Sequence, residues 1–544
     1  MPHRTLIAVM LMALVAPSCA REQPGGTKIG EPTASPGQGG TLVVAIDEDP
    51  GSLNPAITTS GSTHTASELF FNGLVALDEQ GEPSPELARE WRIEEDGRVY
   101  RFHLREGVTW HDGQPFTSAD VKYSFEQVII PFHARTKASM GPALAGIETP
   151  DAHTVVFRFK EPYAPLLLQL NVTEAPIVPR HVYEGTDPQT NPANNTPVGT
   201  GPFRFVSYQK GTEIRAARNE NYFKEGLPYF DEIVQRIIKD RSTQVLSLEN
   251  GEVDFLWNVP GPDQARLRED PNIELGQTAS NPGGSNCIMT IAFNLDRPML
   301  RRLEVRRAIG HALDRQRFVD QILFQEGQVA DAPISSGIPW AHAEGLDLPR
   351  FDRAEAERLL DAAGWRREGQ GPRAARGVAG VPEGTPLAIT FLHFPAFAKY
   401  GELVREQLGA VGIQVNLEPL ESAVFAPRVF REDNFDTAII SYCNGPDPEI
   451  GVRRMYDSTQ IGEAPFTNAS HYSNPEVDRL FEQASQTVDR NQRGQLYRRI
   501  QEIVVRDLPY VWVVETLGTR AWPAECEGFQ PWTGLFAEAG RCRR

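Results

Sequence analysis

The chain has 544 residues, too many for one hydrophobic core, and at about 150 residues per domain it corresponds to about three folding units. With 40% hydrophobic and 23% charged residues, the composition is that of a folded protein whose bulk is water-soluble, and it excludes a membrane bundle and a disordered chain. The formal net charge of −18 repels polyanions and excludes nucleic acid as a partner.

Residues 1–20 have the layout of an export signal. A basic residue precedes an apolar run at residues 6–16, which is too short to span a bilayer, and small residues follow as far as Cys19. The stretch that ends at Cys19 is similar to a lipobox, whose cysteine is acylated and becomes the mature N-terminus, although Ala16 stands where leucine is usual. Cleavage after Ala20 would instead release a soluble protein. We expect export to the periplasm or cell surface and favour a membrane-anchored lipoprotein.

A flexible tether is predicted at residues 21–39. Pro24, Pro32 and Pro36, together with several glycines and small polar residues, cannot bury enough apolar surface to fold. After a lipid-modified cysteine, such a tether would keep the folded body near the membrane.

The folded part begins with strand and helix signals in alternation. Residues 41–47 predict a first strand, which a turn with two prolines ends. Apolar and polar residues alternate at 100–105 and at 154–160, which predicts two half-buried strands. Between them, Ser118 is the predicted cap of a helix.

Helices dominate the signals of the second half. Asp352 is the predicted N-cap of a helix that Gly364 ends. Residues 305–322 predict one amphipathic helix, Asn474 precedes the first residue of another, and a final helix is predicted near residues 492–506.

Two strands accompany these helices. Residues 388–394 and 438–443 read as strands with helical segments between them. This order predicts an α/β unit whose strands lie largely parallel.

Four cysteines follow Cys19, and an even number in an exported chain predicts two disulfides. Cys287, Cys443, Cys526 and Cys542 allow three pairings, although the short separation of the last two favours a local bridge between them. No C-x-x-C motif or nearby histidine accompanies any of the four, so we expect no metal site.

Enzyme motifs are missing from the sequence. It contains no G-x-S-x-G elbow, no H-E-x-x-H and no phosphate-binding loop that ends in Gly-Lys-Ser/Thr. We therefore expect neither catalysis nor a cofactor.

One long motif resembles a known family. Residues 107–121, GVTWHDGQPFTSADV, are similar to the signature of the family 5 solute-binding proteins, the dipeptide and oligopeptide receptors of ABC transporters. Further similar stretches lie at residues 198–203, 219–223, 293–294, 305–309, 312–315, 362–365 and 447–448. The resemblance covers about residues 40–525.

This resemblance implies an α/β, two-lobed periplasmic-binding-protein-like fold (type II, cluster C) with an extra domain and a hinge between the lobes. By the family pattern, the segments divide as follows: domain I takes residues 40–80, 200–286 and 516–544, domain II takes 81–199, and domain III takes 287–515. The family pattern also implies a disulfide between Cys287 and Cys443, which leaves Cys526 to pair with Cys542.

The resemblance implies a receptor and not an enzyme. Such a receptor would be monomeric, would capture a peptide between its lobes, and would deliver it to the permease and ATPase subunits of an ABC importer. Ligand binding would need no cofactor.

The implied ligand contacts lie in three segments. The stretch 439–444 resembles the strand that pairs with the peptide backbone in relatives, which makes Ser441, Tyr442 and Asn444 candidate contacts. Trp257 and Trp512 lie in segments similar to cleft-lining stretches, where flat rings suit pocket walls.

One departure from the family leaves the ligand class open. Peptide receptors place an aspartate shortly after this strand to neutralise the ligand's amino terminus, but Asn444 and Gly445 stand there. The next acid, Asp447, is a candidate contact, although it also begins an Asp-Pro turn. A family 5 receptor for a non-peptide solute, such as an oligosaccharide, a nickel chelate or an opine-like compound, is the alternative.

Overall fold

The computed structural model describes residues 39–78, 81–278, 286–369, 371–462, 465–529 and 540–542. The predicted export signal, Cys19 and the predicted tether as far as residue 38 lie outside these ranges. Within them, no helix combines the length and the apolar character that crossing a bilayer requires.

The first large sheet is assembled from segments that are far apart in the sequence. It has seven strands in the spatial order β12-β21-β11-β1-β10-β9-β8. Their bounds are β1 (Thr41–Ile46), β8 (Phe203–Gln209), β9 (Glu213–Arg218), β10 (Glu232–Ile237), β11 (Phe255–Leu256), β12 (Ile273–Thr278) and β21 (Gly518–Pro523). The predicted first strand is confirmed as β1, which pairs parallel with β10 and β11.

A four-stranded antiparallel sheet follows β1 in the chain. Its order is β4-β5-β7-β6. The bounds are β4 (Ala88–Glu94), β5 (Val99–Leu104), β6 (Leu144–Asp151) and β7 (Thr154–Phe159), so β5 and β7 confirm the two alternating stretches. Leu42 and Val44 of the first sheet belong to the same hydrophobic core as Phe102 and Phe157 of this one. The two sheets therefore share one core.

A six-stranded sheet forms a second centre, in the order β14-β20-β13-β19-β17-β18. Its bounds are β13 (Cys287–Phe293), β14 (Gly327–Val329), β17 (Ala388–His393), β18 (Gln414–Pro419), β19 (Thr437–Cys443) and β20 (Tyr510–Thr516). β17 pairs parallel with β18 and β19, but β13 pairs antiparallel with β19 and β20. The expectation of a largely parallel unit is therefore wrong on one side of β19. β13 begins the unit and β20 ends it, and neither belongs to a crossover that would make it parallel to its neighbour.

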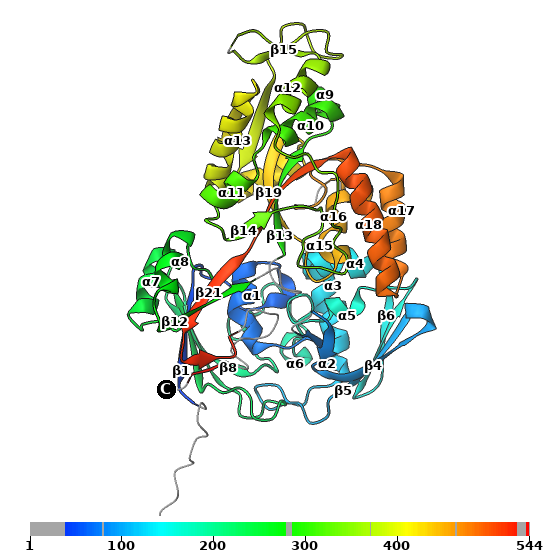
Figure 1. The fold of residues 1–544 in the computed structure, drawn as a ribbon. Coiled ribbons are helices and arrows are strands. Elements are labelled where there is room, and N and C mark those ends of the chain that lie inside the picture. The colour runs from blue at the N-terminus through cyan, green and yellow to red at the C-terminus, as the bar shows by residue number, and fades with distance from the viewer. Residues whose placement is uncertain are drawn as a thin grey trace, which may run out of the picture. The chain divides into compact units, whose positions relative to one another are not determined.

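The six-stranded sheet is buried on both faces. Ile288 and Ala292 of β13 face one core, and Met289 and Ile291 face the other, as the alternation of side chains along a strand requires. The helices α17 (Pro475–Gln486) and α18 (Arg490–Asp507) contribute to the core on one face of this sheet (Figure 1). The helices α10, α12 and α13, which span residues 303–312, 353–362 and 398–410, contribute to the core on the other face. Burial on both faces explains the nearly continuous apolar sequence of β13.

The remaining regular elements are short. Three two-stranded sheets pair β2 (Val75–Leu77) with β3 (Pro83–Pro85), β15 (Trp365–Arg367) with β16 (Arg373–Ala375), and β22 (Cys526–Glu527) with β23 (Arg541–Cys542). The helices other than α17 and α18 have the bounds α1 (Gly61–Ser67), α2 (Ser118–Tyr123), α3 (Ile130–Phe132), α4 (Ala134–Ala143), α5 (Leu166–Gln169), α6 (Arg180–Tyr183), α7 (Arg241–Glu249), α8 (Gly261–Arg268), α9 (Pro298–Arg301), α10 (Leu303–Ala312), α11 (Gln316–Gln321), α12 (Arg353–Ala362), α13 (Ala398–Ala410), α14 (Ser422–Phe430), α15 (Pro448–Gly451) and α16 (Arg453–Tyr456).

Most of the predicted helix caps are confirmed. The side chain of Asp352 accepts a hydrogen bond from the Glu355 amide at 3.0 Å, and Asn474 caps α17 in the same way. The cap of α2 is Thr117 instead of Ser118. The Asp120 side chain accepts a hydrogen bond from the Thr117 amide at 2.9 Å. The N-cap therefore lies one residue before the predicted one.

The single helix predicted at residues 305–322 is wrong, because the chain forms α10 and α11 with a break between them. The break lies at Leu313, whose backbone is extended. The amide of the next residue, Asp314, donates to the side-chain oxygen of Gln407 in α13 and not to the preceding turn. This contact with a distant helix takes the place of a backbone bond of one continuous helix.

Both expected disulfides are present. Cys287 is bonded to Cys443, which is its direct partner across the pair β13 and β19. Cys526 is bonded to Cys542, and the two residues are likewise paired across β22 and β23.

A half-buried glutamate, Glu326, lies where the chain passes from the six-stranded sheet to the seven-stranded sheet. The backbone oxygen of Glu326 accepts a hydrogen bond from the amide of Leu517. Leu517 is the residue between β20 and β21. Side-chain oxygen Oε1 of Glu326 is buried and has no hydrogen-bond partner among the described residues. Burial raises the pKa of Glu326 to about 7, although the Thr519 side chain and the charges of Arg241 and Arg268 oppose this effect.

Substitution Glu326→Gln is expected to stabilise the protein in a pH-dependent way. The raised pKa favours the protonated carboxyl in the folded state, so the stability of the wild type falls as pH rises from 4.5 to about 7. The advantage of glutamine should grow over this interval to about 2 kcal/mol and level off above it. Melting temperatures between pH 4 and 8 test this, with the exposed Glu220→Gln as the control. An advantage that stays constant with pH would contradict the assignment.

Candidate functional site

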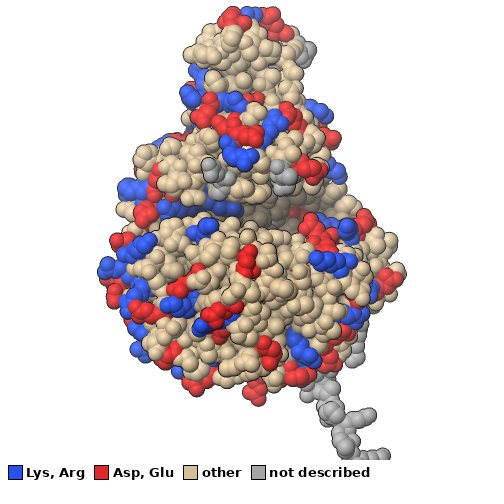
Figure 2. Space-filling model, turned by 180° about the vertical axis from the view of Figure 1, so that it is seen from behind, with Lys and Arg blue, Asp and Glu red and all other residues tan. Residues whose placement is uncertain are grey.

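A cavity of about 490 Å³ lies between elements of the six-stranded sheet's unit and elements attached to the four-stranded sheet. Its walls come from α4 and the segment after β7 on one side, and from α15, α16 and the end of α17 on the other. The volume is in the range of about 300–1,000 Å³ that small-molecule sites occupy. In the space-filling view, the surface is hollowed between the upper and lower parts of the molecule, and basic atoms lie along part of this hollow's rim (Figure 2).

Glu449 of α15 brings a buried carboxylate to this cavity. Its side chain is 4% exposed, and oxygen Oε1 accepts a hydrogen bond from Arg453 at 2.7 Å. The second oxygen, Oε2, is buried and has no hydrogen-bond partner among the described residues. Burial raises the pKa of Glu449 to about 7, even though Arg453 opposes the rise. An acceptor of this kind can take a proton donor from a ligand.

Arg453 is saturated by acidic neighbours. Besides Glu449, it contacts Asp457 at 2.6 Å and Glu482 at 3.2 Å. Its charge is therefore balanced within the protein.

Arg454, the next residue, is in the opposite situation. Its guanidinium donates to the backbone oxygens of Gly451 at 3.1 Å and Cys443 at 3.4 Å, and it lies 5.7 Å from the centre of the Tyr442 ring. No carboxylate of the described chain forms an ion pair with it. Burial lowers the pKa of Arg454 to about 10, which reflects the cost of an unneutralised charge.

Arg135 contributes a second guanidinium from α4, on the other side of the cavity. It forms an ion pair with Glu174 at 2.9 Å, while its Nε atom is buried without a hydrogen-bond partner among the described residues. The charge of Arg135 repels Arg454, and the charge of the Glu174 carboxylate beside it attracts Arg454. The cavity is thus lined by guanidinium groups from two elements, Arg135 of α4 and Arg453 and Arg454 of α16.

The aromatic residues predicted from sequence lie elsewhere. Tyr442 and Trp512 are fully buried in one core, where Tyr442 donates to the Thr467 oxygen and Trp512 donates to Tyr456, each at 2.8 Å. Trp257 lines a separate cavity of about 350 Å³ beside the seven-stranded sheet. Ligand contact by these three residues stays a prediction.

The polar residues predicted from sequence are near the strand end, as expected. Ser441 lies on β19, and the side-chain oxygen of Asn444 accepts a hydrogen bond from the Ser335 amide at 2.7 Å. Asp447 is fully buried and forms a two-pronged ion pair with Arg493, at 2.8 and 2.9 Å. Asp447 also caps α15. None of these three is among the described residues that line the cavity, so their contact with a ligand also stays a prediction.

Sequence reasoning missed Glu449 and Arg454. The available signal was a cluster of charged residues in the short segment directly after a strand, where the ends of strands commonly meet ligands in α/β proteins. The sequence resemblance favours Asp447 instead, but its carboxylate forms an ion pair with Arg493.

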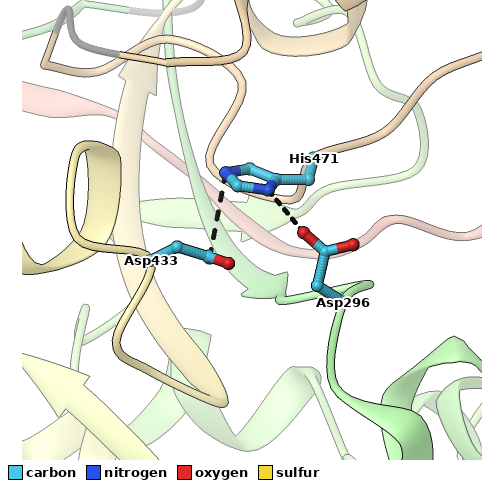
Figure 3. A group of neighbouring side chains, drawn as sticks. All are labelled: Asp296, Asp433 and His471. Atoms are coloured by element: carbon cyan, nitrogen blue, oxygen red, sulfur yellow. Dashed lines mark hydrogen bonds and ion pairs between the residues drawn. The ribbon is translucent and has the colours of Figure 1, made fainter.

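A separate polar cluster joins three loops (Figure 3). His471 contacts Asp296 through Nδ1 at 2.7 Å and Asp433 through Nε2 at 3.8 Å. Asn294 donates to Asp433 at 2.8 Å. Because the two ring nitrogens face different carboxylates, the arrangement suits a bridge between loops better than three ligands of one cation.

The group formed by Asp331, His342 and Glu515 is likewise occupied by protein contacts. The two oxygens of Glu515 accept hydrogen bonds from Ser336 and Gln328. Nδ1 of His342 lies 2.8 Å from the Ile334 backbone oxygen. These contacts give the cluster a structural role.

The chain as a whole is similar to the members of a known protein family. The family model described as bacterial extracellular solute-binding proteins, family 5 Middle, matches residues 82–463. Protein XP55 of Streptomyces lividans is 30% identical over 90% of this chain and 87% of its own length. The oligopeptide-binding protein AppA of Bacillus subtilis is 26% identical over 96% of this chain and 95% of its own length.

Solved structures share the fold. NikZ from Campylobacter jejuni, in complex with Ni(L-His), has a TM-score of 0.77 at 23% identity and covers 92% of this chain and 99% of its own. DppA from Helicobacter pylori, in complex with the peptide STSA, has a TM-score of 0.77 at 24% identity. The match covers 93% of this chain and 99% of the DppA chain. These likenesses confirm the α/β, periplasmic-binding-protein-like fold that the sequence predicts.

Proposed function

This chain belongs to the bacterial extracellular solute-binding proteins of family 5, and from that premise we propose that it is the peptide receptor of an ABC importer. It captures a short peptide in the 490 Å³ cavity and delivers it to a membrane permease driven by ATPase subunits. Elements on both sides of the cavity contact the solute, so binding stabilises the closed arrangement over the open one. No bond is broken, and the protein is not an enzyme.

The observation that carries this proposal is the mixed charge of the cavity. A buried carboxylate, Glu449, and a guanidinium without a carboxylate partner, Arg454, both line it. A peptide with free ends carries the complementary pair of charges. The peptide named with the DppA structure and the name of AppA agree with this ligand class.

The strand β19 supports backbone pairing with such a ligand. It pairs with β13 along its whole length, but with β17 only at Thr437 and Ala438 among the described residues. Residues 439–443 therefore lack a strand partner on that side within the described chain. The sequence resemblance implies that an extended peptide adds at this edge, which lies outside the residues that line the 490 Å³ cavity.

A non-peptide solute is the second candidate. Asn444 and Gly445 stand where an amine-binding aspartate is expected, and guanidinium groups also suit an anionic chelator. The nickel–histidine complex named with NikZ is an example of such a solute. Oligosaccharides and opine-like compounds complete the alternatives.

Several finer features belong to the same proposal. The chain is exported, carries a lipid on Cys19, is tethered by residues 21–39 and acts as a monomer. Its domains follow the boundaries implied by the family pattern, with a hinge between the lobes.

Thermal unfolding in the presence of candidate solutes tests this function. Di- to pentapeptides at a hundred times their dissociation constant should add about 2.7 kcal/mol to the free energy of unfolding, which raises the melting temperature visibly. Sugars and nickel–histidine serve as parallel samples. A rise with these solutes and none with peptides would overturn the peptide assignment and favour the second candidate.

A further inference from the structure

We propose that the turn between α17 and α18 is a latch, which holds the two sides of the 490 Å³ cavity together through contacts between protein groups alone. The turn lies at the ends of these helices that point toward the four-stranded sheet (Figure 1). One backbone hydrogen bond, one apolar contact over a glycine and one ion pair make up the latch. This inference rests on the proposed capture of a solute between the two sides and adds a determinant of closure that does not depend on the solute.

The backbone hydrogen bond joins the C-terminal end of α17 to the segment after β7. The amide of Ala164 donates to the carbonyl oxygen of Ser485 at 2.8 Å. The last carbonyl groups of a helix lack a donor within the helix, so the Ser485 oxygen can accept from another element. On its own side, the preceding Tyr163 donates its amide to the Gly97 oxygen at 3.0 Å. Tyr163 and Ser485 both line the cavity, so this bond closes part of its wall.

The apolar contact places a methyl group of Val488 over Gly97. A β-carbon added at Gly97 would lie 2.5 Å from Cγ2 of Val488, which is closer than two carbon atoms approach without repulsion. Gly97 is buried and has a φ of +91°, so its backbone conformation also favours glycine. The glycine of one side therefore makes room for the valine of the other.

The turn is fixed within its own unit. Thr487 ends α17 and donates its amide to the Ala484 oxygen. Asp489 caps α18 by accepting from the Gln492 amide at 2.8 Å. Val488 stands between these two caps. Because the turn is ordered before it meets the other side, little conformational entropy is lost when the contact forms.

The ion pair joins Arg490, the first residue of α18, to Glu82, which directly precedes β3. The Arg490 guanidinium also lies 5.0 Å from the centre of the Trp340 ring, which positions the side chain from its own unit. The two charged side chains are 34% and 49% exposed, so salt screens the pair and its contribution is small. The backbone hydrogen bond and Val488 therefore supply most of the latch.

The latch sets how often the cavity opens. Its contacts need no solute, so they stabilise the closed arrangement of the free receptor as well as that of the loaded one. A solute enters and leaves only when these contacts are broken. Their contribution is common to every solute that the cavity takes, and it therefore changes the rates of entry and release without selecting among solutes.

Hydrogen exchange at the Ala164 amide, followed by mass spectrometry on the full chain without added solute, measures the opening of the latch. In the wild type, this amide should exchange at least about tenfold more slowly than an unprotected amide. Gly97→Ala brings a β-carbon against Val488 and should raise the exchange rate at least about tenfold. Gly107→Ala is the matched control and should leave the rate unchanged. Gly107 has a φ of +76°, but no atom of the described residues lies within 4 Å of the added carbon.

A second substitution separates the latch from misfolding. Val488→Ala removes the methyl group that the added carbon meets, and the next neighbours of that carbon lie at ordinary contact distances of 3.6 and 3.7 Å. Gly97→Ala combined with Val488→Ala should therefore return the exchange rate toward the wild-type value. Small-angle X-ray scattering should show the largest radius of gyration for Gly97→Ala alone. Arg490→Gln should raise the exchange rate by only about two- to fivefold.

Two results would overturn the latch. Equal exchange rates in Gly97→Ala and Gly107→Ala would remove the role of Val488, and an Ala164 amide that exchanges freely in the wild type would remove the latch as a whole. Because no solute takes part, both results are separate from the test of the proposed function. That function fails when no solute raises the melting temperature, whatever the exchange rate at Ala164.

Discussion

Substitution Arg493→Met is expected to lower the free energy of unfolding by about 3–5 kcal/mol. The guanidinium of Arg493 is 4% exposed, and both of its terminal nitrogens bind Asp447, which is fully buried. Its Nε atom donates to the Ala484 oxygen at 2.8 Å. Methionine removes the cation and leaves the Asp447 carboxylate buried without its counter-charge. Most of the expected loss of stability comes from this unpaired buried charge.

Urea unfolding followed by tryptophan fluorescence measures this loss, because the Trp340 ring lies 5.1 Å from the Arg493 guanidinium. The double variant Asp447→Asn with Arg493→Met should lose less than the sum of the two single variants, since neither charge is then left alone. Arg499→Met on the same helix is the control. Its ion pairs are exposed, so a loss below about 1 kcal/mol is expected. Equal losses at positions 493 and 499 would contradict the structural role of the buried pair.

Removal of the disulfide between Cys287 and Cys443 is the second change with a large expected effect. The two cysteines are separated by 156 residues, and the bond limits the freedom of the unfolded chain over that whole length. In the chain-entropy account, a loop of this length corresponds to about 4–5 kcal/mol. The bond also fixes the ends of β13 and β19, whose register places Cys287 opposite Cys443.

The double variant Cys287→Ser and Cys443→Ser, unfolded by heat and by urea, provides the measurement. The matched control removes the bond between Cys526 and Cys542, whose separation is 16 residues and whose loss should lower stability by about 3 kcal/mol. A loss at the local bridge that equals or exceeds the loss at the long bridge would contradict this account.

The local elements were largely predictable from sequence, because their causes are local. Alternation of apolar residues identified β5 and β7, and a side chain that can accept from a backbone amide identified the start of α12 and of α17. The disulfide between Cys526 and Cys542 followed from their proximity in the chain.

Long-range contacts explain where prediction failed. The helical period continues through residues 313–315, but Leu313 is extended, the Asp314 amide donates to the side chain of the distant Gln407, and the helix breaks. Likewise, the pairing direction of β13 depends on where the chain enters and leaves the sheet, and its apolar sequence carries no information about that.

The candidate site was harder to predict than the fold. An aromatic ring such as Tyr442 suits a core and a pocket wall equally well, and only the packing of the sheet decides between them. The importance of Glu449 arises because α15 packs against α4, which is more than 300 residues away in the chain. Its unpartnered oxygen is a property of that contact and cannot be read from the residues around it.

Native mass spectrometry of the protein with an equimolar pool of di- to pentapeptides tests the central claim most directly. A receptor for short peptides with free ends should carry one peptide per chain, with di- to tetrapeptides selected over longer ones and over their N-acetylated counterparts. Peptide-free protein in the pool, together with one-to-one complexes in a parallel sample of sugars or nickel–histidine, would contradict the assignment of this cavity to peptides.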